Sequence, residues 1–261
     1  MVYSICERSM RMLMLVGALL VSFIFPLTTF FYLRSLHGEE KEYRKDCFDL
    51  LWNGWMLGFP VFGFSLICNI IFKLSRIGQN YSAVELFFSD FVLKALSEEL
   101  MKYLLARYII RKNRARVSFI DLMAYTTFSA IGFEMMEAIF YMFETNVAQI
   151  IVRGVTNMHA AFGLIMGYVM AKGYKEKIKH PVFLGLLIPI IIHGVYDLYL
   201  STEFDDTYWG VISLLIAIIC LVINIALFFF VKKHRSDPYY TDPLFPEEAL
   251  KEAEVQADTQ Q

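Results

Sequence analysis

The chain has 261 residues, of which 57% are hydrophobic and 19% are charged, with a mean hydropathy of +0.49 and a formal net charge of −2. These values exclude an ordinary soluble globular domain, and the lack of a basic stripe argues against nucleic acid as a partner. Aromatic residues make up 16% of the chain, which suits a surface in contact with the lipid bilayer.

Seven apolar stretches are long enough to cross a bilayer, because a helical span needs about 20 residues. They cover residues 12–33, 50–72, 84–110, 118–143, 150–171, 181–200 and 209–231. The sequence therefore predicts an all-α, polytopic transmembrane helical bundle of about seven spans. The count becomes eight if a re-entrant or interfacial helix lies near the N-terminus. The chain is expected to be a multi-pass protein of the cell membrane.

The charge of the loops predicts the orientation. Lys and Arg gather in the loops at 111–116 and 172–179 and after the last span at 232–235. Because basic loops stay on the inner side of a membrane, the C-terminus is expected to be cytoplasmic. We expect one transmembrane domain over 1–235. The polar residues 236–261 are expected to form a disordered cytoplasmic tail.

Ionisable residues appear inside four consecutive spans, although a charge at such a place costs ~3 kcal/mol or more. The third span contains Glu98, Glu99 and Lys102. Glu98 and Lys102 are four residues apart and share a helix face, so they can pair. The fourth span contains Glu134 and Glu137, which are three residues apart and again share a face.

The next two spans contribute histidines. The fifth span contains Asn157 and His159, and the sixth contains His193 and Asp197, four residues apart. At that spacing the carboxylate can orient the imidazole and fix its tautomer. At about 1.5 Å per residue from the cytoplasmic ends, the ionisable residues of all four spans fall in the middle to outer half of the bilayer. The sequence thus predicts one polar cluster in a core at about 84–200.

The order of these motifs resembles the PrsW family, which is grouped with CAAX prenyl proteases and bacteriocin-processing enzymes in a superfamily of intramembrane proteases. The matching residues are EExxK at Glu98, Glu99 and Lys102, GFExxE from Gly132 to Glu137, then His159, then HxxxD at His193 and Asp197. CAAX-type relatives usually have Arg and His where this chain has Lys102 and Glu137, which favours the PrsW branch.

The resemblance implies an intramembrane endopeptidase that cleaves a single-span membrane protein near its extracytoplasmic side. The typical substrate in PrsW-like enzymes is an anti-sigma factor. The side chains expected to carry out the chemistry are Glu98, Glu99, Glu137, His159 and His193. Those expected to support it are Lys102, Glu134, Asn157 and Asp197.

Two mechanisms fit these residues. In the first, Glu98 or Glu99 is a general base, and His193 stabilises the oxyanion. In the second, Glu99, His159 and His193 bind Zn²⁺ or another divalent metal, since two His and one carboxylate form a known catalytic zinc set. The sequence has no HExxH motif, so it leaves both open. Two other classes also use buried carboxylates or this fold: a proton- or cation-coupled transporter or channel, and a non-catalytic scaffold or immunity protein.

Overall fold

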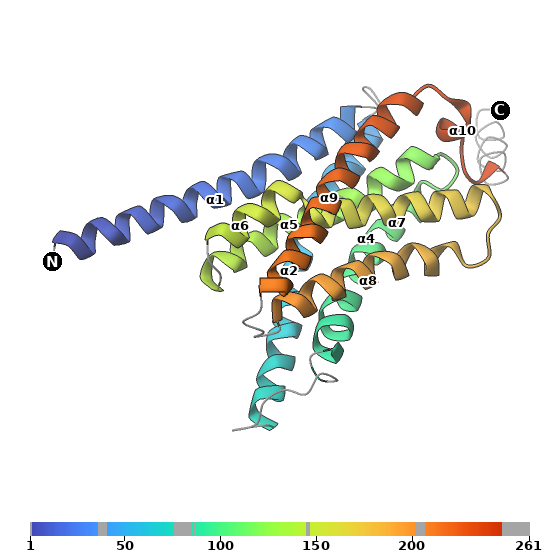
Figure 1. Ribbon diagram of the computed structural model, residues 1–261. Helices are drawn as coiled ribbons and strands as arrows, with labels where there is room; N and C mark the ends of the chain where they lie inside the picture. Colours follow the sequence, from blue (N-terminus) through green and yellow to red (C-terminus); the bar gives the residue numbers. More distant parts are fainter. Residues whose placement is uncertain are drawn as a thin grey trace.

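The computed structural model describes residues 2–35, 41–75, 85, 87–144, 147–201 and 207–246. Within these ranges the chain is a bundle of helices without a strand, apart from an isolated bridge between Ser118 and Pro243. The predicted all-α transmembrane bundle is therefore confirmed (Figure 1). The elements are α1 Val2–Ser35, α2 Lys41–Ser75, the π-helix η1 Phe88–Leu96, α4 Ser97–Lys112, α5 Phe119–Glu144, α6 Val147–Thr156, α7 Met158–Lys175, α8 Pro181–Ser201, α9 Thr207–His234 and α10 Pro238–Thr241.

Five helical segments among the described residues are long and apolar enough to cross a membrane. They are Met12–Ser35, Lys41–Cys68, Ile150–Lys175, Pro181–Leu198 and Leu214–His234. The predicted spans at 84–110 and 118–143 also form helices, but these are outside that set. They are the helices that carry the paired glutamates. The multi-pass character of the protein is thus confirmed, and the count of seven spans stays a prediction.

The predicted span at 150–171 is interrupted, because α6 ends at Thr156 and α7 begins at Met158. Asn157 between them has left-handed backbone angles, φ 49° and ψ 55°, which asparagine tolerates better than most residues. The side-chain amide of Asn224 on α9 donates to the carbonyls of Thr156 and Asn157, at 2.9 Å each. The break is therefore compensated by a neighbouring helix, as a break at membrane depth must be.

Helix α5 lies at the centre of the bundle, and every residue at 117–134 is buried. It packs against α2 on one side and α7 on another. Gly163 and Gly167 allow the approach of α7, because a Cβ at either would meet the backbone of α5. Small residues at a helix interface are the usual way for helices to pack closely within a membrane.

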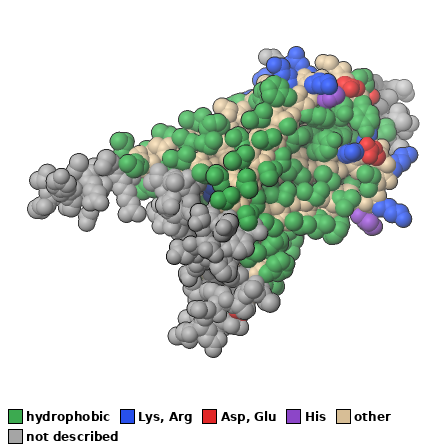
Figure 2. Space-filling model, in the orientation of Figure 1, with side chains coloured by type: hydrophobic (Ala, Val, Ile, Leu, Met, Phe, Trp, Pro, Cys, Tyr) green, Lys and Arg blue, Asp and Glu red, His purple; other side chains and the backbone are tan. Residues whose placement is uncertain are grey.

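The surface separates apolar and charged regions. Figure 2 shows hydrophobic side chains over the middle of the visible face and Lys, Arg and His side chains at one end. In Figure 1 this is the end where α7 ends and α8 begins. We call it the basic end. The arrangement is that of a membrane protein whose basic loops lie at one interface.

The first part of the predicted tail packs against the basic end. Asp237 caps α10 by accepting from the Tyr239 amide at 3.0 Å, and the Leu244 amide donates to the Val117 carbonyl at 2.8 Å. The disorder expected over 236–261 is therefore not found at 237–244, and residues 247–261 lie outside the described residues.

Candidate active site

The five side chains predicted to be catalytic come from four helices and meet in the interior. Glu98 and Glu99 lie on α4, Glu137 on α5, His159 on α7 and His193 on α8. Each is at most 8% exposed. Buried ionisable groups are stabilised by partners, so the contacts between them define the site.

Glu99 is the centre of the cluster. Its Oε1 accepts from Lys102 Nζ at 2.8 Å and lies 2.9 Å from His193 Nδ1. Because a carboxylate only accepts, His193 donates from Nδ1, and its Nε2 faces the other way. That Nε2 is 3.4 Å from Asp197 Oδ2. Glu99 therefore orients His193 more closely than Asp197 does, although the sequence favoured Asp197 for this role.

His159 connects Lys102 to Glu137. Lys102 Nζ lies 2.7 Å from His159 Nδ1, and His159 Nε2 lies 2.7 Å from Glu137 Oε2. An ammonium has no acceptor, so the neutral imidazole must accept at Nδ1 and donate from Nε2. Lys102 thus fixes the tautomer of a histidine that is 57 residues away in sequence.

Glu98 is the least restrained acid of the cluster. Its Oε2 lies 3.6 Å from Lys102 Nζ and 3.7 Å from His193 Nε2, and it has no hydrogen-bond partner. The second oxygen of Glu99, Oε2, is also buried without a partner. Since buried polar atoms are nearly always hydrogen-bonded, these two oxygens indicate a place for a water, an ion or a substrate group.

Aromatic rings form walls around the cluster. Lys102 Nζ lies 4.2 Å from the centroid of the Phe133 ring, and Phe162 stacks on His193 with ring centroids 5.3 Å apart. The apolar walls keep bulk water away and strengthen each electrostatic contact inside.

The other predicted supporting residues lie at the edge. Glu134 Oε2 accepts from the Ala160 amide at 3.4 Å, near the start of α7. The polar contacts of Asn157 are with α1 and α9, because its Nδ2 donates to Thr29 Oγ1 at 3.0 Å and its carbonyl accepts from Asn224. The structure therefore brings Lys102, Glu134 and Asp197 to the cluster, and Asn157 shapes the helix break beside it.

Arg153 on α6 is a member of the site that the sequence interpretation missed. Its Nη2 lies 2.7 Å from Glu137 Oε2, and its side chain is 12% exposed. The guanidinium lies 4.2 Å from the centroid of the Tyr141 ring, and Nη1 is buried without a hydrogen bond. A cation inside a predicted span was the available signal, because such a charge requires a buried partner.

The donor atoms fit a divalent metal. Glu98, Glu99, His159 and His193 each offer one ligand atom, and these atoms lie within 4.8 Å of one another. Imidazoles with carboxylates suit Zn²⁺, and the unpartnered oxygens of Glu98 and Glu99 suit any cation. Lys102 Nζ contacts the same set, so His159 Nδ1 is available to an ion only when the ammonium withdraws.

Comparison with known proteins agrees with this geometry. A family model described as PrsW family intramembrane metalloprotease matches residues 48–228. A protein named Protease PrsW from Clostridioides difficile (strain 630) is 30% identical over 60% of this chain and 67% of its own length. The proteins of that name from Oceanobacillus iheyensis and Bacillus subtilis (strain 168) are 28% and 24% identical, over 54% and 70% of this chain and 67% and 81% of their own lengths. No solved structure matches the chain significantly.

Proposed function

The chain belongs to the PrsW family of intramembrane proteases, and from this premise we propose that it hydrolyses a peptide bond of a single-span membrane protein near the extracytoplasmic side. An anti-sigma factor is the substrate class that we propose to test first. The observation that carries the proposal is the unpartnered carboxylate oxygen of Glu98 beside Lys102 and His193, in a buried site walled by aromatic rings.

Glu98 is the general base of the proposed mechanism. It takes a proton from the attacking water as the water oxygen bonds to the substrate carbonyl carbon. It then gives that proton to the leaving amine when the C–N bond breaks. Each acid has one buried oxygen without a hydrogen bond, but Glu98 is preferred because Glu99 is held in place through Oε1 by Lys102 and His193 and serves to position them.

Lys102 and His193 are the proposed donors to the oxyanion, and His193 donates from Nε2 in its doubly protonated form, since its Nδ1 proton is already donated to Glu99. Both are held by Glu99 Oε1, at 2.8 and 2.9 Å, so they are positioned before the charge develops. Preorganised donors in a site without bulk water are usually the largest contribution to such a reaction. His159 and Glu137 extend this support, since His159 Nδ1 accepts a second hydrogen bond from Lys102 and its Nε2 is held by Glu137.

In a metal-bound form Lys102 and His193 would no longer be the oxyanion donors, because Lys102 would have to withdraw and His193 would be a ligand. Glu99, His159 and His193 would hold the ion and Glu98 would remain the base. A bound divalent ion supplies Lewis acidity, which lowers the pKa of a water and polarises a carbonyl.

The orientation completes the proposal. We propose that the catalytic core at 84–200 lies within a transmembrane domain at 1–235. The basic end and the C-terminal tail at 236–261 then face the cytoplasm, because Lys and Arg gather in the loops there.

The experiment co-expresses the full chain with tagged single-span proteins, including anti-sigma factors, and maps the new termini by mass spectrometry. We expect wild type and the control Glu176→Gln, an exposed loop acid, to give the same product, and Glu98→Gln to give none. Cleavage by Glu98→Gln at the wild-type rate would overturn the assigned base. New termini in the cytoplasmic half of the substrate span would overturn the proposed side of cleavage.

A further inference from the structure

A cavity of about 160 Å³ lies at the basic end, between the last turns of α4 and α7 and the first turn of α8. Its lining is rich in arginine and tyrosine and contains no acidic residue among the described ones: Tyr103, Arg107, Ile110, Arg111, Arg114, Leu122, Met170, Tyr174, Val182 and Phe245. It is separate from the glutamate and histidine cluster. We call it the arginine cavity.

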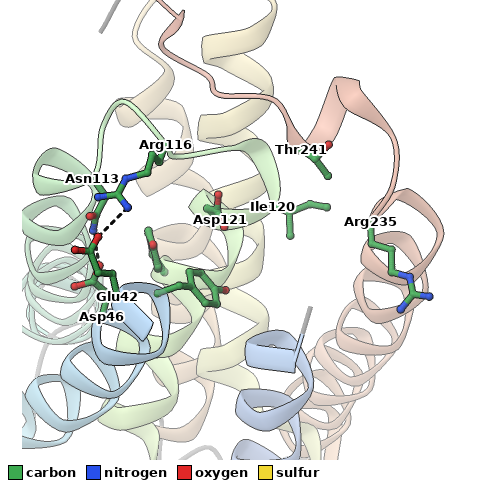
Figure 3. Close-up of a pocket in the computed structure, with 10 residues that line it drawn as sticks. Glu42, Asp46, Asn113, Arg116, Ile120, Asp121, Arg235 and Thr241 are labelled. Atoms are coloured by element: carbon green, nitrogen blue, oxygen red, sulfur yellow. Dashed lines mark hydrogen bonds and ion pairs between the residues drawn. The ribbon is translucent and has the colours of Figure 1, made fainter. Parts of the chain in front are cut away.

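A neighbouring cavity at the same end allows a comparison of how arginine side chains are paired. Figure 3 shows that cavity, of about 230 Å³, where α2 and α5 begin. There Arg116 Nη1 pairs with Glu42 Oε2 at 2.8 Å, and Asn113 donates to Asp46. An acidic group inside the lining therefore balances Arg116.

The arginine cavity differs, because none of its described lining residues is acidic. Arg107 is half-buried, and among the described residues neither Arg107 nor Arg111 forms an ion pair. Arg114 lies over Phe245, with its guanidinium carbon 4.2 Å from the ring centroid, and Phe245 also contacts Tyr174. Burying a charge without a partner is costly, so half-buried Arg107, which has no ion pair among the described residues, makes this cavity a candidate site for an anion.

The surface beside the cavity is apolar and open to lipid. Leu100, Leu104 and Tyr108 form an exposed row on α4, with exposed fractions of 36%, 42% and 69%. This row lies next to the row of Arg107 and Arg111, because residues four apart line one helix face. Phe183 at the start of α8 is 61% exposed. An acyl chain can therefore lie along the helices while its headgroup enters the cavity.

We propose that the arginine cavity binds the phosphate group of an anionic phospholipid headgroup. Guanidinium groups match phosphate oxygens with paired hydrogen bonds, and the tyrosine hydroxyls of Tyr103 and Tyr174 add two further donors. Basic pockets between transmembrane helices at a membrane interface are suited to such headgroups. The inference is independent of the proteolytic reaction.

The test titrates the purified full chain in a neutral detergent with short-chain phosphatidylglycerol and follows the midpoint of thermal unfolding. We expect phosphatidylglycerol to raise the midpoint and phosphatidylcholine to leave it unchanged. Arg107→Gln combined with Arg111→Gln should weaken the apparent affinity by about tenfold or more, since charge-assisted hydrogen bonds are lost. The matched control combines Lys232→Gln with Lys233→Gln, two exposed lysines at the same end.

The arms of the experiment separate the possible results. Equal weakening in both double variants, or no midpoint shift in wild type, would overturn the site, because only general surface charge would then be at work. If inorganic phosphate reproduces the full shift, the result would support a phosphate site and show that its ligand is a soluble phosphate instead of a lipid headgroup. Arg107→Lys with Arg111→Lys, checked for helicity by circular dichroism, should keep part of the affinity if the variants are folded.

Discussion

The cluster around Glu99 and the carboxylates at the basic end are both buried, but their partners differ. Asp46 accepts from Asn113 and from Lys112 Nζ at 3.2 Å, and Asp121 Oδ2 accepts from the amide and hydroxyl of Ser118. These contacts hold the ends of helices. In the cluster, the acids contact other buried ionisable side chains, at 2.8 Å within α4 for Glu99 and Lys102 and at 2.7–2.9 Å between helices for the glutamate–histidine pairs.

The difference separates carboxylates that stabilise helix ends from carboxylates that are placed for a reaction. An acid that caps a helix end stabilises the fold and needs no further group. An acid that is held among buried basic groups is a candidate for proton transfer or charge stabilisation in a reaction.

The largest effect is expected at Glu98. Replacing Glu98 by Gln should lower the rate of substrate cleavage by roughly 10²–10⁴-fold, the usual contribution of a general base, because the amide cannot take the proton from water. The measurement is the rate of product formation in proteoliposomes. Asp46→Asn, a buried acid of the basic end, should stay within about threefold of wild type; a similar loss in both variants would remove the contrast.

A smaller effect is expected at Arg153, which holds Glu137 through a 2.7 Å ion pair. Arg153→Gln should lower kcat by about 10–100-fold with little change in KM, as for other groups that orient a site residue. Arg153→Lys should recover part of kcat relative to Arg153→Gln, because lysine restores the positive charge but not the additional N–H groups of the guanidinium. Arg116→Gln is the matched control at an exposed arginine. A loss in KM alone would assign Arg153 to substrate binding instead.

A substitution of Lys102 tests whether the cluster binds a metal ion. The Lys102 ammonium contacts Glu99 Oε1 and His159 Nδ1. Lys102→Met should therefore free both atoms to bind a metal ion and remove a positive charge that repels the ion. We expect zinc binding to tighten by about tenfold, or about 1.4 kcal/mol, measured by competition with a chelator. Adding His159→Ala should cancel the gain. Unchanged zinc affinity in Lys102→Met would show that the ammonium does not compete with an ion.

The smallest effect is expected at the basic end. Asp121 and Ser118 exchange hydrogen bonds between side chain and backbone at the start of α5. Asp121→Ala should lower the free energy of unfolding by about 1 kcal/mol and leave cleavage within about twofold of wild type. The midpoint of thermal unfolding and the cleavage rate are measured on the same sample. A large loss of cleavage at unchanged stability would contradict the division into two regions.

The sequence was sufficient for the all-α transmembrane bundle and for the prediction that the glutamates and histidines of four spans meet, although it missed Arg153 and the break at Asn157. Long apolar stretches predict spans, and carboxylates inside them stand out because they are costly there. It was insufficient for contacts between helices that are distant in sequence. The bond of Lys102 to His159 depends on how α7 packs on α5, and two glycines set that approach.

The break at Asn157 shows a second limit. Pro26, Pro60 and Pro189 lie inside continuous helices, whereas the interruption falls at an asparagine. The reason is tertiary, since Asn224 is distant in sequence from the break and its side-chain amide donates to the freed carbonyls. Arg153 was missed for the same reason, because its partner Glu137 belongs to another helix.

The position of α5 has a consequence for how the protein is made. Among the described helices, α5 is buried at 117–134, carries Glu134 and Glu137, and is not one of the five segments apolar enough to cross a membrane by themselves. The apolar α1 and α2 are synthesised before it and pack against it. We therefore expect α5 to be retained in the bilayer by helices that arrived earlier, so that biogenesis of the enzyme depends on the order of its segments.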